Sequence, residues 1–76
     1  MIFPNPASDY VRIANFEPGD EDAVLNIYDI SGKLCQEIKL SGLDLRKVEI
    51  KLVPGMYIAQ IATGSTVQHV QKLVVV

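Results

Sequence analysis

The chain contains 76 residues, a length that allows a single domain. Hydrophobic residues make up 49% of the sequence, too much for a disordered tail, and the net charge of -2 argues against binding to nucleic-acid phosphates. A core of this size rarely supplies more than about 3–5 kcal/mol of net stability, so we expect a marginally stable fold. No apolar run reaches the roughly 18 residues of a membrane span, and the sequence after Met1 lacks the pattern of a secretory signal peptide.

Short segments with the two-residue period of β-strands follow one another along the chain. The first covers residues 9–14, where Val11 and Ile13 share a face opposite Arg12. An acidic turn built on a Pro-Gly pair follows at residues 16–22. The pattern predicts an amphipathic strand and then a solvated turn.

A hairpin is expected next. Its first strand covers residues 23–29, with Leu25 and Ile27 on one face, and a Ser-Gly turn at residues 31–32 leads into a second strand over residues 33–40. The apolar face predicted for this second strand consists of Leu34, Gln36, Ile38 and Leu40, with the glutamine as its one polar member.

Three further strands complete the pattern. Residues 47–52 alternate most regularly, and residues 56–62 are apolar on both faces, as in a central strand covered on both sides or by a partner. The last strand covers residues 66–76. The inward residues expected in the first of these three strands are Val48, Ile50 and Leu52. About six to seven short antiparallel strands predict an all-β fold, a small immunoglobulin-like β-sandwich, with a small β-barrel as the alternative.

The last strand ends in four consecutive apolar residues, 73–76, with no charged residue after Lys72. As a bare edge, such a strand would invite pairing with another chain, whereas as an inner strand of the sandwich it would be buried. The sequence leaves both alternatives open. It also leaves the buried face open, because Val67 and Leu73 share one parity and Val70 has the other.

Residues that could support catalysis or bind a metal are sparse. His69, the only histidine, has no nucleophile motif around it, and Cys35, the only cysteine, is expected to be a small hydrophobic residue on a strand. Asp20, Glu21 and Asp22 are adjacent but lack the ligand spacing of a calcium loop, so we expect a solvated turn. We therefore predict that the chain is not an enzyme and has neither a metal site nor a cofactor.

An aromatic platform for sugars is an alternative, built on Tyr10, Tyr28 and Tyr57. Two of these tyrosines lie on separate apolar strands, where tyrosine more often belongs to the core. An immunoglobulin-like or fibronectin-like module that binds glycan or protein therefore remains a rival to the interpretation that follows.

Four short blocks together span almost the whole chain: residues 4–9 (PNPASD), 27–34 (IYDISGKL), 52–58 (LVPGMYI) and 72–75 (KLVV). In this order they resemble the opening, the central hairpin, the L-x-x-G-x-Y segment and the terminal strand of one family. This family is the C-terminal sorting domain of the type IX (Por) secretion system.

The resemblance implies a secretion signal that directs an upstream cargo protein across the outer membrane and is then typically cleaved off. It implies as partners the outer-membrane translocon with its shuttle proteins and a sortase-like cysteine protease, with passage through the periplasm to the cell surface or the medium. The mechanism we expect is the addition of a partner strand at an edge next to the chain end. The residues to which the resemblance assigns recognition are Gly55, Tyr57, Gly64, Lys72, Leu73, Val74, Val75 and Val76.

Three further expectations complete the sequence prediction. Residues 1–6 are predicted to be a linker, because Pro4 and Pro6 stiffen an extended segment that cannot join a sheet, and residues 7–76 form the single domain. Met1 fits a start residue placed before a domain cut from a longer protein. In isolation the apolar last strand should favour a dimer, including one formed by strand swapping.

Overall fold

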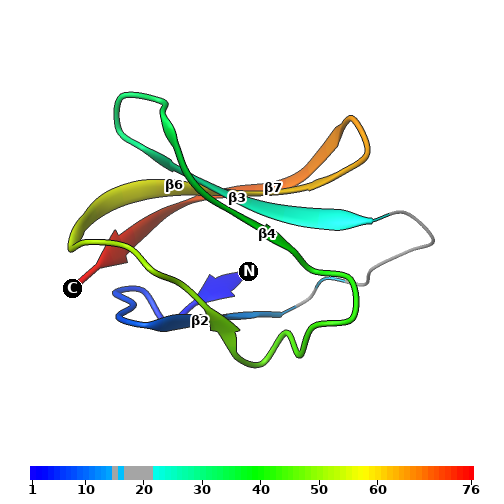
Figure 1. Cartoon of the computed structure of the whole chain (residues 1–76), viewed down its shortest axis with the longest axis horizontal. Coiled ribbons are helices and arrows are strands. Elements are labelled where there is room, and N and C mark those ends of the chain that lie inside the picture. Colours follow the sequence, from blue (N-terminus) through cyan, green and yellow to red (C-terminus); the bar gives the residue numbers. More distant parts are fainter. Residues whose placement is uncertain (15, 17–21) are drawn as a thin grey trace.

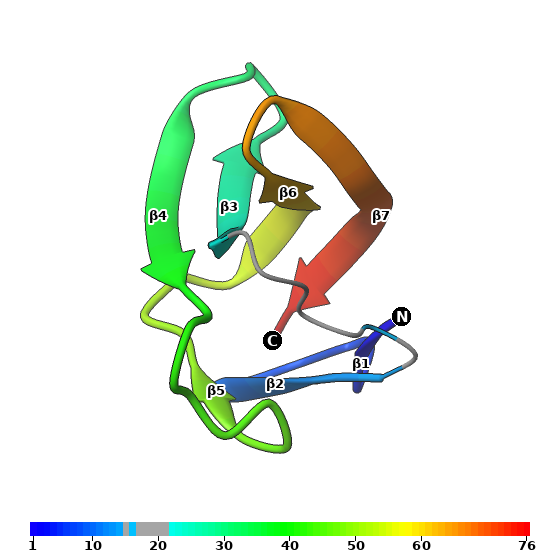
Figure 2. The same ribbon diagram turned by 90° about the vertical axis from the view of Figure 1, so that its right-hand side faces the viewer.

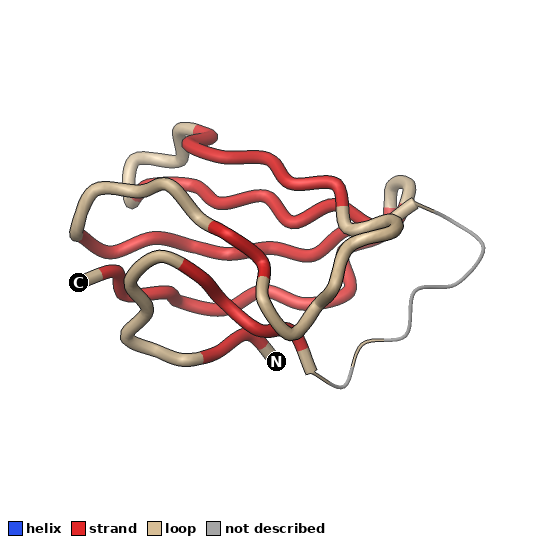
Figure 3. Tube along the Cα trace, turned by 60° about the horizontal axis from the view of Figure 1, so that its bottom comes forward, coloured by secondary structure: helices blue, strands red, loops and turns tan. Residues whose placement is uncertain are grey.

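The computed structural model describes residues 1–14, 16 and 22–76. Every element in these residues is a strand or a loop (Figure 3), so the all-β prediction is confirmed. Most of the predicted acidic turn, including Asp20 and Glu21, lies outside the described residues, while Asp22 is exposed.

Seven strands form two sheets that pack face to face as a small β-sandwich (Figure 2). The smaller sheet has the strand order β1-β2-β5, the larger sheet has the order β4-β3-β6-β7, and the paired strands are antiparallel. In chain order the strands are β1 (Ile2–Phe3), β2 (Tyr10–Ile13), β3 (Ala23–Asp29), β4 (Leu34–Lys39), β5 (Val48–Glu49), β6 (Gly55–Thr63) and β7 (Thr66–Val75).

Strand alternation places every second side chain in the core between the sheets. In β2, Val11 and Ile13 are buried and Arg12 is exposed, as the sequence predicts. In β3, Leu25 and Ile27 are each 0% exposed. Full burial of one such side chain is worth about 1.5–3 kcal/mol, so these positions supply much of the stability of the domain.

The strand expected over residues 47–52 is shorter than predicted. Only Val48–Glu49 forms a strand, paired with β2. The inward positions are nevertheless correct, since Val48 and Ile50 are buried and Leu52 packs partly against the core.

The tight turn between β3 and β4 forms as predicted. The Asp29 Oδ1 atom accepts hydrogen bonds from the Ser31 amide at 2.9 Å, the Ser31 hydroxyl at 2.6 Å and the Lys33 amide at 3.0 Å. Gly32 has a φ of 90°, a left-handed conformation that glycine adopts without strain. The hydroxyl of Ser31 first, and the amide of Lys33 second, lower the pKa of Asp29 because they stabilise its charged form.

One prediction for β4 is wrong. The sequence pattern places Leu34 on the apolar face with Leu40, but Leu34 is 44% exposed and Leu40 only 4%. The pairing of β3 with β4 shifts register between Ile27 and Tyr28, so that Cys35 is an extra residue and Leu34 lies opposite Tyr28. A β-bulge of one residue moves the following side chain to the other face of the sheet.

A second bulge decides the faces of β7. Leu73 points into the core and is 0% exposed. The pairing of β6 with β7 shifts register between Ile61 and Ala62, which leaves Gln68 as the extra residue and places Val67 opposite Ala62. Val67 is consequently 51% exposed, although it shares its parity with Leu73.

The prediction that the N-terminal segment cannot join a sheet is wrong for its first part. Ile2 and Phe3 form β1, which pairs with β2, and Ile2 is 1% exposed. Proline removes only its own N–H, so Pro4 and Pro6 lie outside the strands without preventing their neighbours from pairing. Ile2 and Phe3 thus belong to the smaller sheet, whereas Pro4, Asn5 and Pro6 are exposed.

The larger sheet leaves one side uncovered by described residues. We call this side, which faces away from the smaller sheet, the outer face. Of the two alternatives predicted for the strand β6, coverage on both sides does not hold among the described residues, because its side chains on the outer face are partly exposed. Coverage by a partner stays a prediction. The large apolar residues exposed on the outer face are Leu34 (44%), Met56 (47%), Ile58 (37%), Val67 (51%) and Val70 (55%).

Candidate functional site: the edge of the C-terminal strand

The strand β7 is the last of the larger sheet, so one of its edges pairs with β6 and the other borders the sheet (Figure 1). The inner side chains of its C-terminal half are anchored, since Leu73 is 0% and Val75 is 2% exposed. Val76, in contrast, is 67% exposed. The two alternatives left open by the sequence therefore each hold in part: the strand is buried on one face and lies at an edge.

The N-terminal segment, residues 2–7, lies along this border of β7. Ala7 forms a parallel bridge with Val75, in which the Ala7 amide donates to the Val74 carbonyl oxygen at 2.8 Å. The Ala7 carbonyl oxygen accepts from the Val76 amide, also at 2.8 Å. The apolar end of β7 is thus hydrogen-bonded on both sides.

Two side-chain amides extend this contact. Asn5 donates through Nδ2 to the Lys72 carbonyl oxygen and accepts at Oδ1 from the Val74 amide, both at 2.9 Å. Gln71 accepts at Oε1 from the Ile2 amide at 2.8 Å and donates through Nε2 to the Ile2 carbonyl oxygen at 2.7 Å. Each side chain thus supplies a donor and an acceptor, as a backbone peptide unit would.

These roles of Asn5 and Gln71 are not evident from the sequence. In chain order, 69 residues separate Ile2 from Gln71, and 69 separate Asn5 from Val74. The sequence offers only one weak signal, a polar residue placed where the surrounding pattern needs none: an asparagine between two prolines and a glutamine on the inward parity of the last strand.

Most residues that the resemblance assigns to recognition meet at one end of the larger sheet. Gly55 is the cross-strand partner of Val75, and Tyr57 is the partner of Leu73. Gly64 does not join them, because it lies in the hairpin between β6 and β7 with a φ of 58°. Their role in recognition stays a prediction.

Tyr57 shapes the start of β6. Its ring is buried, and its hydroxyl donates to the Val53 carbonyl oxygen at 2.6 Å. A Cβ atom on Gly55 would lie 3.7 Å from this ring, an ordinary contact. This hydrogen bond joins the loop before β6 to the strand, so the role of Tyr57 in the folded chain is structural.

The three tyrosines do not form a common platform for sugars. Tyr57 is in the core, whereas Tyr28 lies on the outer face opposite Ile58. Tyr10 belongs to β2 in the smaller sheet, with the Nζ atom of Lys47 5.9 Å from its ring centroid. The aromatic rings therefore lie in three different parts of the molecule.

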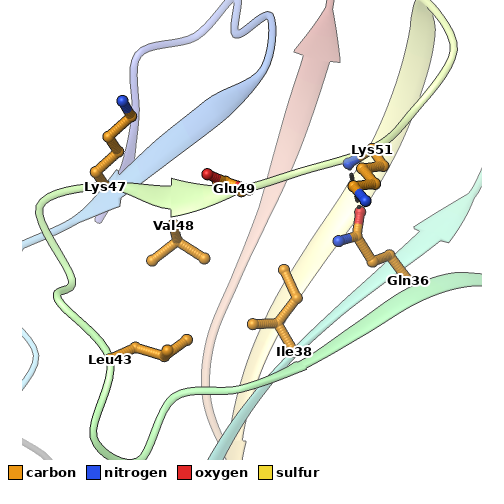
Figure 4. A pocket seen from close by; sticks show the side chains of 7 residues that line it. All are labelled: Gln36, Ile38, Leu43, Lys47, Val48, Glu49 and Lys51. Atoms are coloured by element: carbon orange, nitrogen blue, oxygen red, sulfur yellow. Dashed lines mark hydrogen bonds between the residues drawn. The ribbon is translucent and has the colours of Figure 1, made fainter.

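A pocket of about 530 Å³ opens between β4 and β5 (Figure 4). Ile38 and Val48 line it from the two sheets. On one side the Lys51 amide donates to the Gln36 Oε1 atom at 2.9 Å, which explains the polar residue on the inward side of β4. Among the described residues that line the pocket, Glu49 is the single carboxylate and none is a histidine or cysteine, so they offer no nucleophile–base pair.

His69 and Cys35 are the remaining candidates for catalysis or metal binding. His69 Nε2 lies 2.7 Å from the Gln71 Oε1 atom, the same oxygen that binds the N-terminal segment. Cys35 lies on a strand as predicted but is exposed. In the part of the chain that the structure describes, no group of three His, Cys, Asp or Glu side chains could hold a metal ion. Nor does that part contain a helix long and apolar enough to cross a membrane.

Comparison with known proteins identifies the family. A family model described as the secretion system C-terminal sorting domain matches residues 1–76, the full length of the chain. Searches of curated proteins and of solved structures find no match. Domains of this family are C-terminal signals for type IX secretion, are carried on the same chain as their cargo and are not themselves catalytic. Because the match covers the whole chain, the protein belongs to the secretion system C-terminal sorting domain family and is a signal for export to the cell surface or the extracellular space.

Proposed function

We propose that the outer-membrane translocon recognises this domain through the C-terminal half of β7 and the adjoining chain end. One observation carries the proposal: the main-chain groups of Lys72, Val74 and Val76 already bind an extended segment along the border of β7. Strand addition uses such groups for affinity and the flanking side chains for specificity. In this proposal, Leu73 and Val75 hold the strand in the core while its other residues contact the partner.

The remaining residues assigned to recognition do not all lie at this end of the sheet, since Gly55 and Tyr57 do and Gly64 lies at the opposite end of β7. Gly55 and Tyr57 hold the neighbouring strand β6 in register with the end of β7, and Gly64 closes the hairpin that joins the two strands. We propose that these three act by positioning β7, and that the side chains of Lys72 and Val76 contact the partner directly.

The proposed route begins with transport of the cargo into the periplasm. Shuttle proteins and the translocon then engage the folded domain, and a sortase-like cysteine protease removes it at the cell surface. Residues 1–6 serve as the junction with the cargo, and residues 7–76 serve as the domain. Unlike a free linker, this junction is hydrogen-bonded to β7 through Ile2 and Asn5.

The test is an export assay in a bacterium with a type IX system. Residues 1–76 are fused to the C-terminus of a fluorescent protein that carries an inner-membrane signal, and delivery to the surface or medium is compared with a translocon-deletion strain. Deletion of Lys72–Val76 would remove two core residues, so a second variant changes only exposed ones: Lys72→Glu with Val76→Asp. Its matched control is Lys39→Glu with Val53→Asp, where both side chains are also exposed.

We expect the variant at residues 72 and 76 to lower export by about tenfold or more, and the control to export like the original chain. Export that survives the changes at residues 72 and 76 would reject the end of β7 as the recognition surface. Retention of the unmodified fusion in the periplasm would reject translocon recognition of this domain altogether, and screens for glycan and protein binding would follow.

A further inference from the structure

The groups that an incoming strand would need are occupied in the folded chain. Alternate residues of a strand direct their N–H and C=O groups to the same edge. We call the edge of β7 that faces away from β6 its outer edge. The groups on this edge are the Lys72 carbonyl, the Val74 amide, the Val74 carbonyl and the Val76 amide. All four are hydrogen-bonded to Asn5 or Ala7.

We propose that residues 2–7 are an internal ligand of β7, and that an extended strand of the secretion machinery binds by displacing them. The inference rests on the proposed function, because it assumes recognition at the end of β7. It adds that the recognition edge is closed in the free domain and opens only when the N-terminal segment leaves. The segment that joins the domain to the cargo is then in direct contact with the strand that carries the export signal.

The chemistry of the segment suits it for replacement. Pro4 and Pro6 have no N–H to donate, and two of the four groups on β7 are held by the side chain of Asn5 instead of by main chain. A partner strand without prolines could bind the same four groups from its backbone alone. It would therefore form a more regular ladder than the segment it replaces.

The edge also offers a place where displacement can begin. Among the described residues, no strand pairs with the outer edge of β7 between Thr66 and Val70, since the contacts of the N-terminal segment start at Gln71. A partner strand can pair there first and then advance toward Val76, replacing the contacts of Asn5 and Ala7 one at a time.

A disulfide that fastens the segment to β7 tests the proposal. Ala7 and Val75 are bridge partners, and neighbouring strands lie about 4.8 Å apart, within the Cα separation that disulfides accept. In a Cys35→Ser background, Ala7→Cys with Val75→Cys locks the segment in place. The control pair, Val24→Cys with Lys39→Cys, joins cross-strand partners of β3 and β4, and the single Ala7→Cys and Val75→Cys variants control for the substitutions themselves.

In the export assay we expect the locked variant to fall by about tenfold or more, while the control pair and both single variants are exported. Export of the locked variant with its disulfide intact would overturn the proposal. If no variant is exported, the unmodified chain included, the proposed function is rejected. Release of the N-terminal segment is then tested separately by hydrogen exchange.

Hydrogen exchange tests release without the secretion machinery. The Ala7 amide donates to the Val74 carbonyl oxygen, and the Val76 amide donates to the Ala7 carbonyl oxygen. Neither amide is bonded to Asn5. If the segment opens as a unit, Asn5→Ala accelerates exchange of both amides by about tenfold, whereas Gln60→Ala, which removes an amide side chain on the outer face, leaves them unchanged. Unchanged exchange in Asn5→Ala would show that the segment does not open as proposed.

Discussion

At the residue scale, Asp29 shows how one side chain fixes a turn. Three hydrogen bonds converge on its Oδ1 atom, and they favour the carboxylate over the carboxylic acid. The pKa of Asp29 is therefore lowered in the folded state, chiefly by the Ser31 hydroxyl. A carboxyl group whose pKa falls on folding stabilises the fold above its unfolded pKa, and this contribution disappears as the pH falls through the folded pKa.

We therefore predict that Asp29→Asn has a lower melting temperature than the unmodified chain at about pH 7, and that the difference shrinks on acidification to about pH 2. The asparagine oxygen still accepts hydrogen bonds but carries no charge, so the variant isolates the charged contribution. Circular dichroism melts at both pH values measure the difference. A difference that stays constant on acidification would contradict the assignment.

At the element scale, the two bulges explain why the sequence predicts the strands better than their faces. The two-residue period correctly identifies the inward residues of β2, β3 and β5, which contain no extra residue. It fails at Leu34 and does not decide the face of Val67, because an extra residue in one strand, Cys35 or Gln68, is visible only once the partner strand is known. Alternation is a property of one strand, whereas a bulge is a property of a pair.

The candidate site was predictable to a similar degree. Its apolar residues on β7 stand out in the sequence, and so does the tension between a bare edge and a buried strand. What resolves the tension is the N-terminal segment, whose contact with β7 joins opposite ends of the chain. No local period reports a contact of that kind, and the prolines of the segment argue against pairing.

The faces of β7 lead to a stability prediction. Leu73→Ala, at a position that is 0% exposed, should cost about 2–5 kcal/mol, a loss comparable with the roughly 3–5 kcal/mol that is the most a core of this size usually supplies. Val67→Ala has the same parity but lies on the outer face, so its cost should stay within about 0.5 kcal/mol. Urea titration measures the free energy of unfolding of both variants. A large loss of stability in Val67→Ala would contradict the bulge at Gln68, which places Val67 on the outer face.

At the scale of the whole molecule, the outer face gathers five exposed large apolar residues on one side of the larger sheet. Monomeric proteins rarely expose large contiguous apolar patches. We propose that the isolated chain associates into dimers through this face. The edge of β7 contributes little to this association, because the N-terminal segment covers half of it.

We expect the chain to sediment as a dimer at high concentration, and Met56→Glu with Ile58→Lys to restore the monomer. The control is Val53→Glu, a change to an apolar residue that is 75% exposed but lies outside the outer face. Sedimentation velocity over a concentration series measures the shift. A chain that remains monomeric at every concentration contradicts the proposal.

The parallel alignment of residues 2–7 with residues 71–76 has a mechanical consequence. When residues 1 and 76 are pulled apart, the two segments slide past each other, and their six hydrogen bonds bear the load together. A strand that enters from the side at Thr66 breaks the same bonds singly. The contact therefore resists tension along the chain while yielding to stepwise replacement, so traction on the cargo alone is a poor way to open it.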